Sequence, residues 1–276
     1  MLAGLFQYEF IQNAFIAGLL IGVLAPLLGV FIVVRRLALI ADALSHITLA
    51  GIAASLLLEK KWSAYTLNPL YMGMAFSVIG SLFIEKLRKV YKYYQELAIP
   101  IILSGGIGLG VLLISLAEGF NTDLFNYLFG SVNAVSRSDM WTIVAITLSV
   151  IIVILLFYKE LFSLSFDEEH ATAAGIKTKL VNFIFIMMVA LVIAASMRVV
   201  GILLVSSLMT LPVAASIRVA TGFKQTIFLS ILFGEIAVIG GLILSYYLNL
   251  APGGTIVILS VVLLVGTIAA QKWKVN

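Results

Sequence analysis

Long runs of apolar residues, separated by short polar segments, divide the chain into nine stretches. Most hold about 20 residues, the length that an α-helix needs to cross the hydrocarbon core of a bilayer. The runs are continuous and lack the alternation of apolar and polar residues that marks the strands of a membrane barrel. The pattern predicts membrane-spanning helices over 10–34, 37–58, 69–85, 97–117, 140–158, 180–197, 199–218, 226–248 and 254–271.

Two boundaries between these runs are weak. Arg35 and Arg36 leave almost no loop between the first two runs, and Met197 and Arg198 are the only polar break in a very long apolar stretch. If one of these boundaries is wrong, the count is eight. The predicted fold is therefore an all-α, polytopic transmembrane bundle of 8–9 helices, forming one transmembrane domain over 1–276.

Composition supports a protein embedded in a lipid bilayer. Of the 276 residues, 62% are hydrophobic and 11% are charged, whereas soluble domains average roughly 45–50% apolar and about 25% charged residues. The spans leave no room for a soluble catalytic domain. The absence of cysteine excludes disulfides, thiolate metal ligands and thiol catalysis.

Lysine and arginine fall unevenly on alternate loops. Thirteen lie on one set of loops (Arg35, Arg36, Lys86, Arg88, Lys89, Lys92, Lys159, Lys177, Lys179, Arg218, Lys224, Lys272, Lys274) and four on the other (Lys60, Lys61, Arg137, Arg198). Cytoplasmic loops carry the excess of basic residues. This rule places the N-terminus outside and the C-terminus in the cytoplasm, and it explains the net charge of +4 without a nucleic-acid partner. The first ten residues lack the features of a signal peptide.

Few ionisable residues fall well inside the predicted spans, and Asp42 and His46 are two of them. Four residues apart on a helix is one turn, about 6 Å of rise and roughly 40° of rotation, so both side chains share a face. A carboxylate and an imidazole there are able to grip one divalent cation, with Ser45 positioned to orient a ligand. Oxygen and nitrogen ligands suit zinc and manganese, but two ligands leave a site incomplete, and a symmetric dimer would supply the pair again. An Asp–His hydrogen bond that locks packing or relays protons is the alternative.

Other features of the sequence have simpler interpretations. Glu235, also within a span, has no partner visible in the sequence, which favours a structural role. Small residues such as Gly18 and Gly22, or Gly106 and Gly110, predict close helix packing. The glycine run over 104–110 resembles a nucleotide-binding loop but lies mid-span, and no P-loop motif occurs in the chain.

A polar segment between two spans predicts a short cytoplasmic helix over 166–177. Acidic residues begin it, alanines fill it and Gly175 ends it. A metal site at His170 is less favoured than a solvated helix start. Sequence alone does not separate a docking element from an ordinary loop.

Five blocks of the chain resemble the membrane subunit of bacterial ABC importers for zinc, manganese or iron. They are 29–51, which is the most specific, followed by 126–131, 167–175, 200–212 and 252–257, and they occur in family order over nearly the whole chain. Asn133 and the Met197-Arg198 pair depart from the usual family pattern. The resemblance implies a type-II-like ABC importer permease that forms a homodimer in the bacterial cell membrane.

The resemblance also implies partners and roles. The partners are a second copy of the chain, a cytoplasmic ABC ATPase dimer that hydrolyses ATP, and an extracytoplasmic metal-binding lipoprotein or periplasmic protein. Asp42 and His46 match the family's metal-contacting positions, and no permanent cofactor or enzymatic activity is expected. The resemblance makes the helix over 166–177 the coupling helix, the element that contacts the ATPase. The residues expected in this contact are Asp167, Glu168, Glu169, His170, Ala171, Ala174 and Gly175.

The identity of the metal is the finest of these expectations. Ala41 and Ala50, without a proline at position 50, resemble the zinc branch rather than the manganese branch. Zn²⁺ is therefore the expected cargo, with Mn²⁺ and then iron as alternatives, entering at an outer mouth formed by 59–68, 118–139 and 249–254. Two alternatives belong to other classes of protein. One is a self-sufficient transporter or channel that uses Asp42, His46 and Glu235. The other is an intramembrane hydrolase, which is disfavoured because the chain lacks the motifs that such an enzyme requires.

Overall fold

The computed structural model describes residues 8–61, 68–91, 93–117, 119, 122–131, 134–202 and 204–275, except for the side chains of 122, 123 and 272–275. The regular structure of these residues is helical. Its elements are α2 (Glu9–Val34), α3 (Leu39–Lys61), α4 (Pro69–Val90), the 3₁₀ turn η1 (Gln95–Leu97), α5 (Ala98–Leu116), α6 (Thr122–Phe129), α7 (Arg137–Leu156), α8 (Tyr158–Phe166), α9 (Glu168–Ala173), α10 (Thr178–Val200), α11 (Val205–Ile217), α12 (Phe223–Leu248) and α13 (Pro252–Val275).

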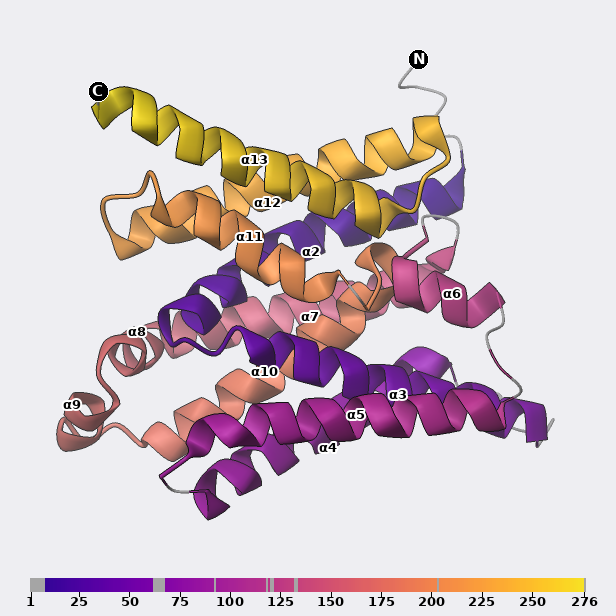
Figure 1. Ribbon diagram of the computed structural model, residues 1–276, viewed down its shortest axis with the longest axis horizontal. Helices are drawn as coiled ribbons and strands as arrows, with labels where there is room; N and C mark the ends of the chain where they lie inside the picture. Colours follow the sequence, from indigo (N-terminus) through magenta and orange to yellow (C-terminus); the bar gives the residue numbers. More distant parts are fainter. Residues whose placement is uncertain are drawn as a thin grey trace.

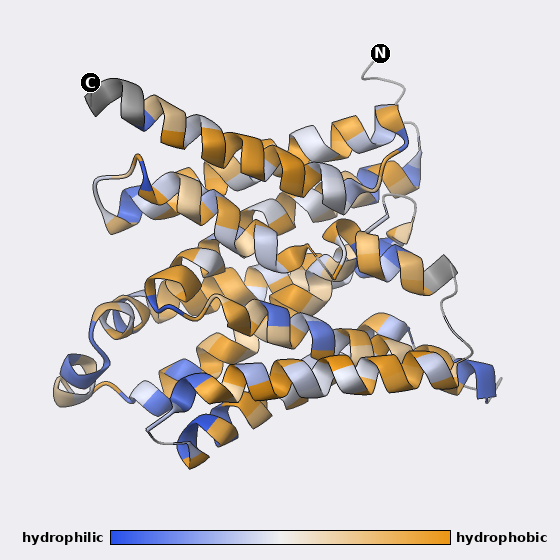
Figure 2. Ribbon diagram, viewed as in Figure 1, coloured by the Kyte–Doolittle hydropathy of each residue, from blue (hydrophilic) through white to orange (hydrophobic). Residues whose placement is uncertain are grey.

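The long helices lie roughly side by side and form one bundle (Figure 1). Eight helices among the described residues are long and apolar enough to span a membrane. Hydrophobic residues fill their middle portions and hydrophilic residues gather toward the two ends (Figure 2). The predicted all-helical transmembrane bundle is confirmed.

Helix α11, which corresponds to the predicted span over 199–218, is shorter than the other helices that match predicted spans. Its 13 residues extend about 20 Å, less than the roughly 30 Å of a hydrocarbon core. The predicted span over 199–218 was therefore wrong at its start. The break does not fall at Met197 and Arg198, which belong to α10, but after Val200, where Gly201 adopts a φ of 86° and ends that helix.

A second difference concerns the end of the predicted span over 140–158. Helix α7 ends at Leu156, and a separate helix α8 begins at Tyr158. The change of direction at Phe157 carries no glycine or proline, so the apolar pattern runs through it without a break. The predicted helix over 166–177 is likewise shorter, because Phe166 belongs to α8 and the helix itself is α9.

Helices α2 and α10 lie at the centre of the bundle. Helix α2 packs against α7, α10, α11 and α12, and α10 packs against α2, α3, α4 and α7. Helices α3, α4 and α5 form one side of the bundle and α11, α12 and α13 the other (Figure 1). The first and last long helices end at opposite ends of the bundle: α2 begins at the end where α6 lies, and α13 finishes at the end where α8 and α9 lie (Figure 1).

Candidate metal-translocation site

Asp42 and His46 lie on α3, whose first turn contains Asp42. Both residues are half-buried, while Ala41, Ala43 and Leu44 beside them are fully buried. Because the helix is regular through this region, the two side chains share one face, as the spacing predicts. The Ser45 hydroxyl is buried and has no hydrogen-bond partner among the described residues.

Helix α3 is held closely by its two neighbours. A Cβ added to Gly106 of α5 would lie 3.0 Å from the backbone nitrogen of Ile47 and 3.3 Å from the carbonyl carbon of His46. On another side of α3, a Cβ on Gly51 would lie 2.8 Å from the carbonyl oxygen of Met72 in α4. Gly106 of α5 is therefore a point of close packing for the helix that carries the candidate ligands.

Glu235 lies apart from this pair. It belongs to α12, which packs against α2, α11 and α13, whereas α3 packs against α4, α5, α10 and α11. The Glu235 Oε1 atom is buried, has no hydrogen-bond partner among the described residues, and faces Gly22 of α2. The structure thus does not bring Glu235 together with Asp42 and His46.

The described residues contain no group of three or more histidines, cysteines and carboxylates able to hold a metal, so one chain supplies only two of the ligands that an ion needs.

The acidic segment at the end of the bundle forms the six-residue helix α9. The Asp167 carboxylate accepts a hydrogen bond of 2.8 Å from the backbone N–H of His170, and so caps the helix. Gly175, with a φ of 86°, turns the chain toward α10. Asp167, Glu168, Glu169 and His170 are exposed, whereas Ala171 is buried. Helix α9 projects beyond the long helices next to α8 (Figure 1).

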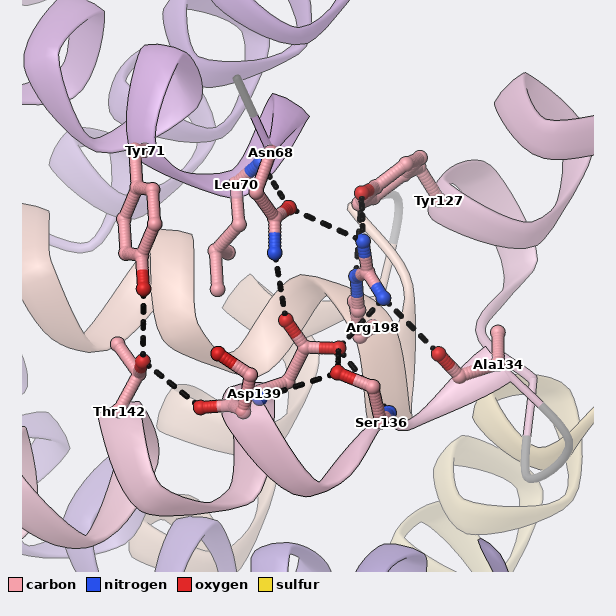
Figure 3. Close-up of polar contacts among 10 residues, drawn as sticks. Asn68, Leu70, Tyr71, Tyr127, Ala134, Ser136, Asp139, Thr142 and Arg198 are labelled. Carbon is pink, nitrogen blue, oxygen red and sulfur yellow. Dashed lines mark hydrogen bonds and ion pairs between the residues drawn. The ribbon is translucent and has the colours of Figure 1, made fainter. Parts of the chain in front are cut away.

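A buried ion pair at the opposite end of the bundle was not predicted. Arg198 of α10 donates a hydrogen bond of 2.5 Å to the Asp139 carboxylate of α7 (Figure 3). The side chain of Asp139 is 1% exposed and that of Arg198 is 17% exposed. Sequence reasoning placed Arg198 at a turn because the residue that pairs with it is 59 positions away.

The remaining donors and acceptors of this ion pair are also occupied. Arg198 donates to the Tyr127 hydroxyl at 2.6 Å and to the Asn68 side-chain carbonyl at 3.1 Å. Asp139 accepts hydrogen bonds from the Asn68 amide at 3.1 Å and from the Ser136 hydroxyl at 2.6 Å. The cluster links α4, α6, α7 and α10 (Figure 3).

Two cavities lie near this end of the bundle. One of about 350 Å³ lies next to Arg198 and includes Leu56, Glu59 and Asn126 in its lining. The other, of about 650 Å³, is lined by Ser131, Tyr246 and Asn249 among others. Both coincide with parts of the expected outer mouth over 59–68, 118–139 and 249–254, whose residues 62–67, 118, 120, 121, 132 and Asn133 lie outside the described part of the chain.

An all-helical bundle with eight helices able to span a membrane, and a short helix beyond their ends, has the architecture expected of a membrane permease. Residues 7–271 match the model of the ABC 3 transport family, and the chain belongs to that family. It is a permease component of a metal ABC importer.

Curated relatives and a solved structure agree with this assignment. The chain is 37% identical over 266 residues to the "Probable metal transport system membrane protein" of Treponema pallidum, covering 96% of this chain and 97% of that protein. It is 34% identical to the manganese transport system membrane protein MntC of Listeria monocytogenes, covering 95% and 91%. PsaBC of Streptococcus pneumoniae, solved in complex with a Fab, matches with a TM-score of 0.82 and 30% identity, over 96% of this chain and 93% of that one.

Proposed function

We propose that this permease carries a divalent transition metal across the membrane and that Asp42 and His46 contact the metal on its way. The observation that carries the proposal is the pair itself, a half-buried carboxylate and imidazole one turn apart on a helix fixed between α4 and α5. An ionisable residue inside a membrane span is costly and marks an ion pathway by default. Two ligands from each of two chains would complete a four-ligand site on the axis of a homodimer.

Manganese is the first candidate for the cargo. Relatives such as MntC of Listeria monocytogenes are named for manganese transport, and oxygen and imidazole ligands suit Mn²⁺. Zinc is the second candidate, because Ala41 and Ala50 resemble the zinc branch and Zn²⁺ accepts the same ligands. The zinc expectation is not confirmed by the relatives and stays a prediction.

The same proposal assigns a partner protein to each end of the bundle. An ABC ATPase dimer hydrolyses ATP at the cytoplasmic end and contacts α9 and the turn after it, through Asp167, Glu168, Glu169, His170, Ala171, Ala174 and Gly175. A metal-binding protein docks at the outer end beside the two cavities. The excess of basic residues assigns the N-terminus to the outside and the C-terminus to the cytoplasm.

Transport by the assembled complex tests this function. The chain, its ATPase and its binding protein are reconstituted in liposomes, and uptake of Mn²⁺ and of Zn²⁺ is measured with and without ATP. We expect uptake that requires ATP, with Mn²⁺ carried faster than Zn²⁺. Faster uptake of Zn²⁺ would make zinc the first candidate, and metal uptake by the chain alone without ATP would overturn the proposed ATP-driven transport.

Charge reversal on α9 tests where the ATPase docks. The variant Glu169→Lys is expected to weaken co-purification of the ATPase, because it places a positive charge on the exposed surface of the coupling helix. The matched change Glu59→Lys, at the opposite end of the bundle, leaves co-purification unchanged. Equal co-purification of the ATPase with both variants would contradict docking on α9.

A further inference from the structure

Three polar side chains from different segments form a chain of hydrogen bonds at the end of the bundle where α9 lies. Arg35, just after α2, donates to the side-chain carbonyl of Asn182 in α10. The amide group of the same Asn182 donates to the Glu168 carboxylate at 3.1 Å. Glu168 is the first residue of α9. Asn182 therefore joins the candidate coupling helix to the connection between α2 and α3.

The Arg35 end of this chain is held in a confined place. Its guanidinium lies over the Phe185 ring, 5.0 Å from the ring centroid, and its Nη1 atom is buried without a hydrogen-bond partner among the described residues. Burial and the nearby Arg88 lower the pKa of Arg35 to about 10, with partial compensation from Glu168 and Glu85. A buried cation with an unpaired nitrogen depends strongly on the hydrogen bonds that remain, so its position follows Asn182.

The connection between Arg35 and the candidate metal ligands is short and stiff. Arg36 adopts a left-handed conformation with a φ of 57°, and the N–H of Leu37 bonds the carbonyl of Ile32 at 2.8 Å. This is the hydrogen-bond pattern of a Schellman helix ending. The Ile40 N–H then bonds the Leu37 carbonyl at 2.9 Å as α3 begins, and Asp42 follows two residues later. Arg35 is thus joined to the first turn of α3 by a short link with hydrogen bonds of its own.

We propose that the Glu168–Asn182–Arg35 chain transmits the position of the coupling helix to the helix that carries Asp42 and His46. The inference rests on the proposed function and adds three positioning residues to it, which touch neither the metal nor ATP. When the ATPase moves α9, Asn182 pulls or releases Arg35, and the start of α3 shifts with it. Contiguous hydrogen-bonded chains between packed elements are a physical route for such coupling.

The ratio of metal transported to ATP hydrolysed tests the proposal in the reconstituted complex. Asn182→Leu removes both hydrogen bonds while keeping a side chain of similar size. Asn182→Asp keeps the acceptor for Arg35 but cannot donate to Glu168. We expect each variant to lower metal uptake per ATP by about fivefold or more, within the range of measured coupling between sites, while ATP hydrolysis continues. The yield of the complex and its melting temperature check that the variants fold. If Asn182→Leu does not fold, the result for Asn182→Asp decides the test.

Two neighbouring positions serve as matched controls. Arg36→Gln removes a charge next to Arg35 from an exposed side chain. Lys179→Gln changes an exposed side chain of α10 that lines, together with Asn182, a cavity of about 260 Å³. Both are expected to keep the wild-type ratio, whereas Arg35→Gln lowers it. An unchanged ratio in the Asn182 and Arg35 variants, with a wild type that transports metal, overturns the inference alone. A wild type without ATP-driven uptake overturns the proposed function and this inference with it.

Discussion

Two groups of ionisable residues within the long helices differ in how their polar atoms are satisfied. Arg198 and Asp139 neutralise each other, and Asn68, Tyr127 and Ser136 complete their hydrogen bonds (Figure 3). Asp42 and His46 lie one turn apart on α3, beside a Ser45 hydroxyl that has no partner among the described residues. A closed cluster fixes four helices in place, whereas a pair with free ligand capacity is suited to an ion that comes and goes. The difference in hydrogen bonding is consistent with a structural role for the Arg198 cluster and with the proposed transport role of Asp42 and His46.

The largest expected effect concerns transport. Asp42→Ala or His46→Ala should reduce metal uptake by about 100-fold or more, because either change removes two of the four ligands of the proposed dimer site, one from each chain. Uptake of Mn²⁺ by the reconstituted complex measures it. The melting temperature should stay close to that of the wild type, since neither side chain takes part in a closed cluster.

A matched control for these variants lies on the next turn of α3. Thr48 is buried, and its hydroxyl donates only to the Leu44 carbonyl of its own helix at 2.7 Å. Thr48→Val keeps its shape and should keep uptake. If Asp42→Ala and His46→Ala both transport metal at the rate of Thr48→Val, the metal-contact role is wrong.

The next effect concerns stability at the closed cluster. Arg198→Ala leaves the Asp139 carboxylate buried without its counter-charge, which should lower the free energy of unfolding by about 3–5 kcal/mol. Denaturation of the purified chain in detergent micelles measures the loss. The double variant Arg198→Ala/Asp139→Ala should lose less than the sum of the two single changes, because the cost lies in the charge that remains.

An exposed ion pair nearby provides the comparison. Arg137 and Glu9 approach to 3.5 Å, but their side chains are 73% and 67% exposed. Arg137→Ala should therefore change stability by no more than about 1 kcal/mol. Equal losses for Arg137→Ala and Arg198→Ala would show that burial adds nothing to the Arg198 cluster.

A smaller effect is expected from the packing of α5 on α3. A Cβ on Gly106 would lie 2.9 Å from the Ile47 Cγ1 atom, next to His46, whereas a Cβ on the neighbouring Gly105 meets nothing within 4 Å. Gly106→Ala should cost about 1–3 kcal/mol through overpacking and should slow uptake by shifting α3. Thermal unfolding of the two glycine variants measures the difference, and a Gly105→Ala variant as unstable as Gly106→Ala would contradict it.

The sequence predicted this molecule well where one physical term dominates. The cost of placing polar groups in lipid produces long apolar runs, so the predicted span over 226–248 corresponds closely to α12 at Phe223–Leu248. Prediction from the sequence fails where the contact that decides the structure joins residues far apart in the chain. Arg198 interrupts the apolar pattern and suggests a turn, yet it lies inside α10 because Asp139 of α7 neutralises it. Helix α8 was missed because its nine residues are too few for a span and no glycine or proline marks its start at Tyr158.

The same limits apply to the candidate site. Helical spacing alone predicts that Asp42 and His46 share a face, because four residues make about one turn. The Glu168–Asn182–Arg35 chain left no such signal, since its members come from three segments that meet only in the folded bundle. Glu235 resembled Asp42 in the sequence, and only the folded bundle shows that it faces α2 rather than the candidate ligands.

The smallest effect concerns a carboxylate that is satisfied locally and lies outside the spans. Asp167→Ala removes the cap of α9, which should destabilise that helix by about 1 kcal/mol, and it should weaken binding of the ATPase by a few fold while the bundle keeps its melting temperature. Asp167→Ser restores a capping oxygen without the charge. Binding recovered by serine shows that the shape of α9 matters for docking, whereas binding lost equally with serine and alanine shows that the negative charge itself contacts the ATPase. Asp167 thereby tests whether local satisfaction, as in the Arg198 cluster, marks a structural role outside the membrane as well.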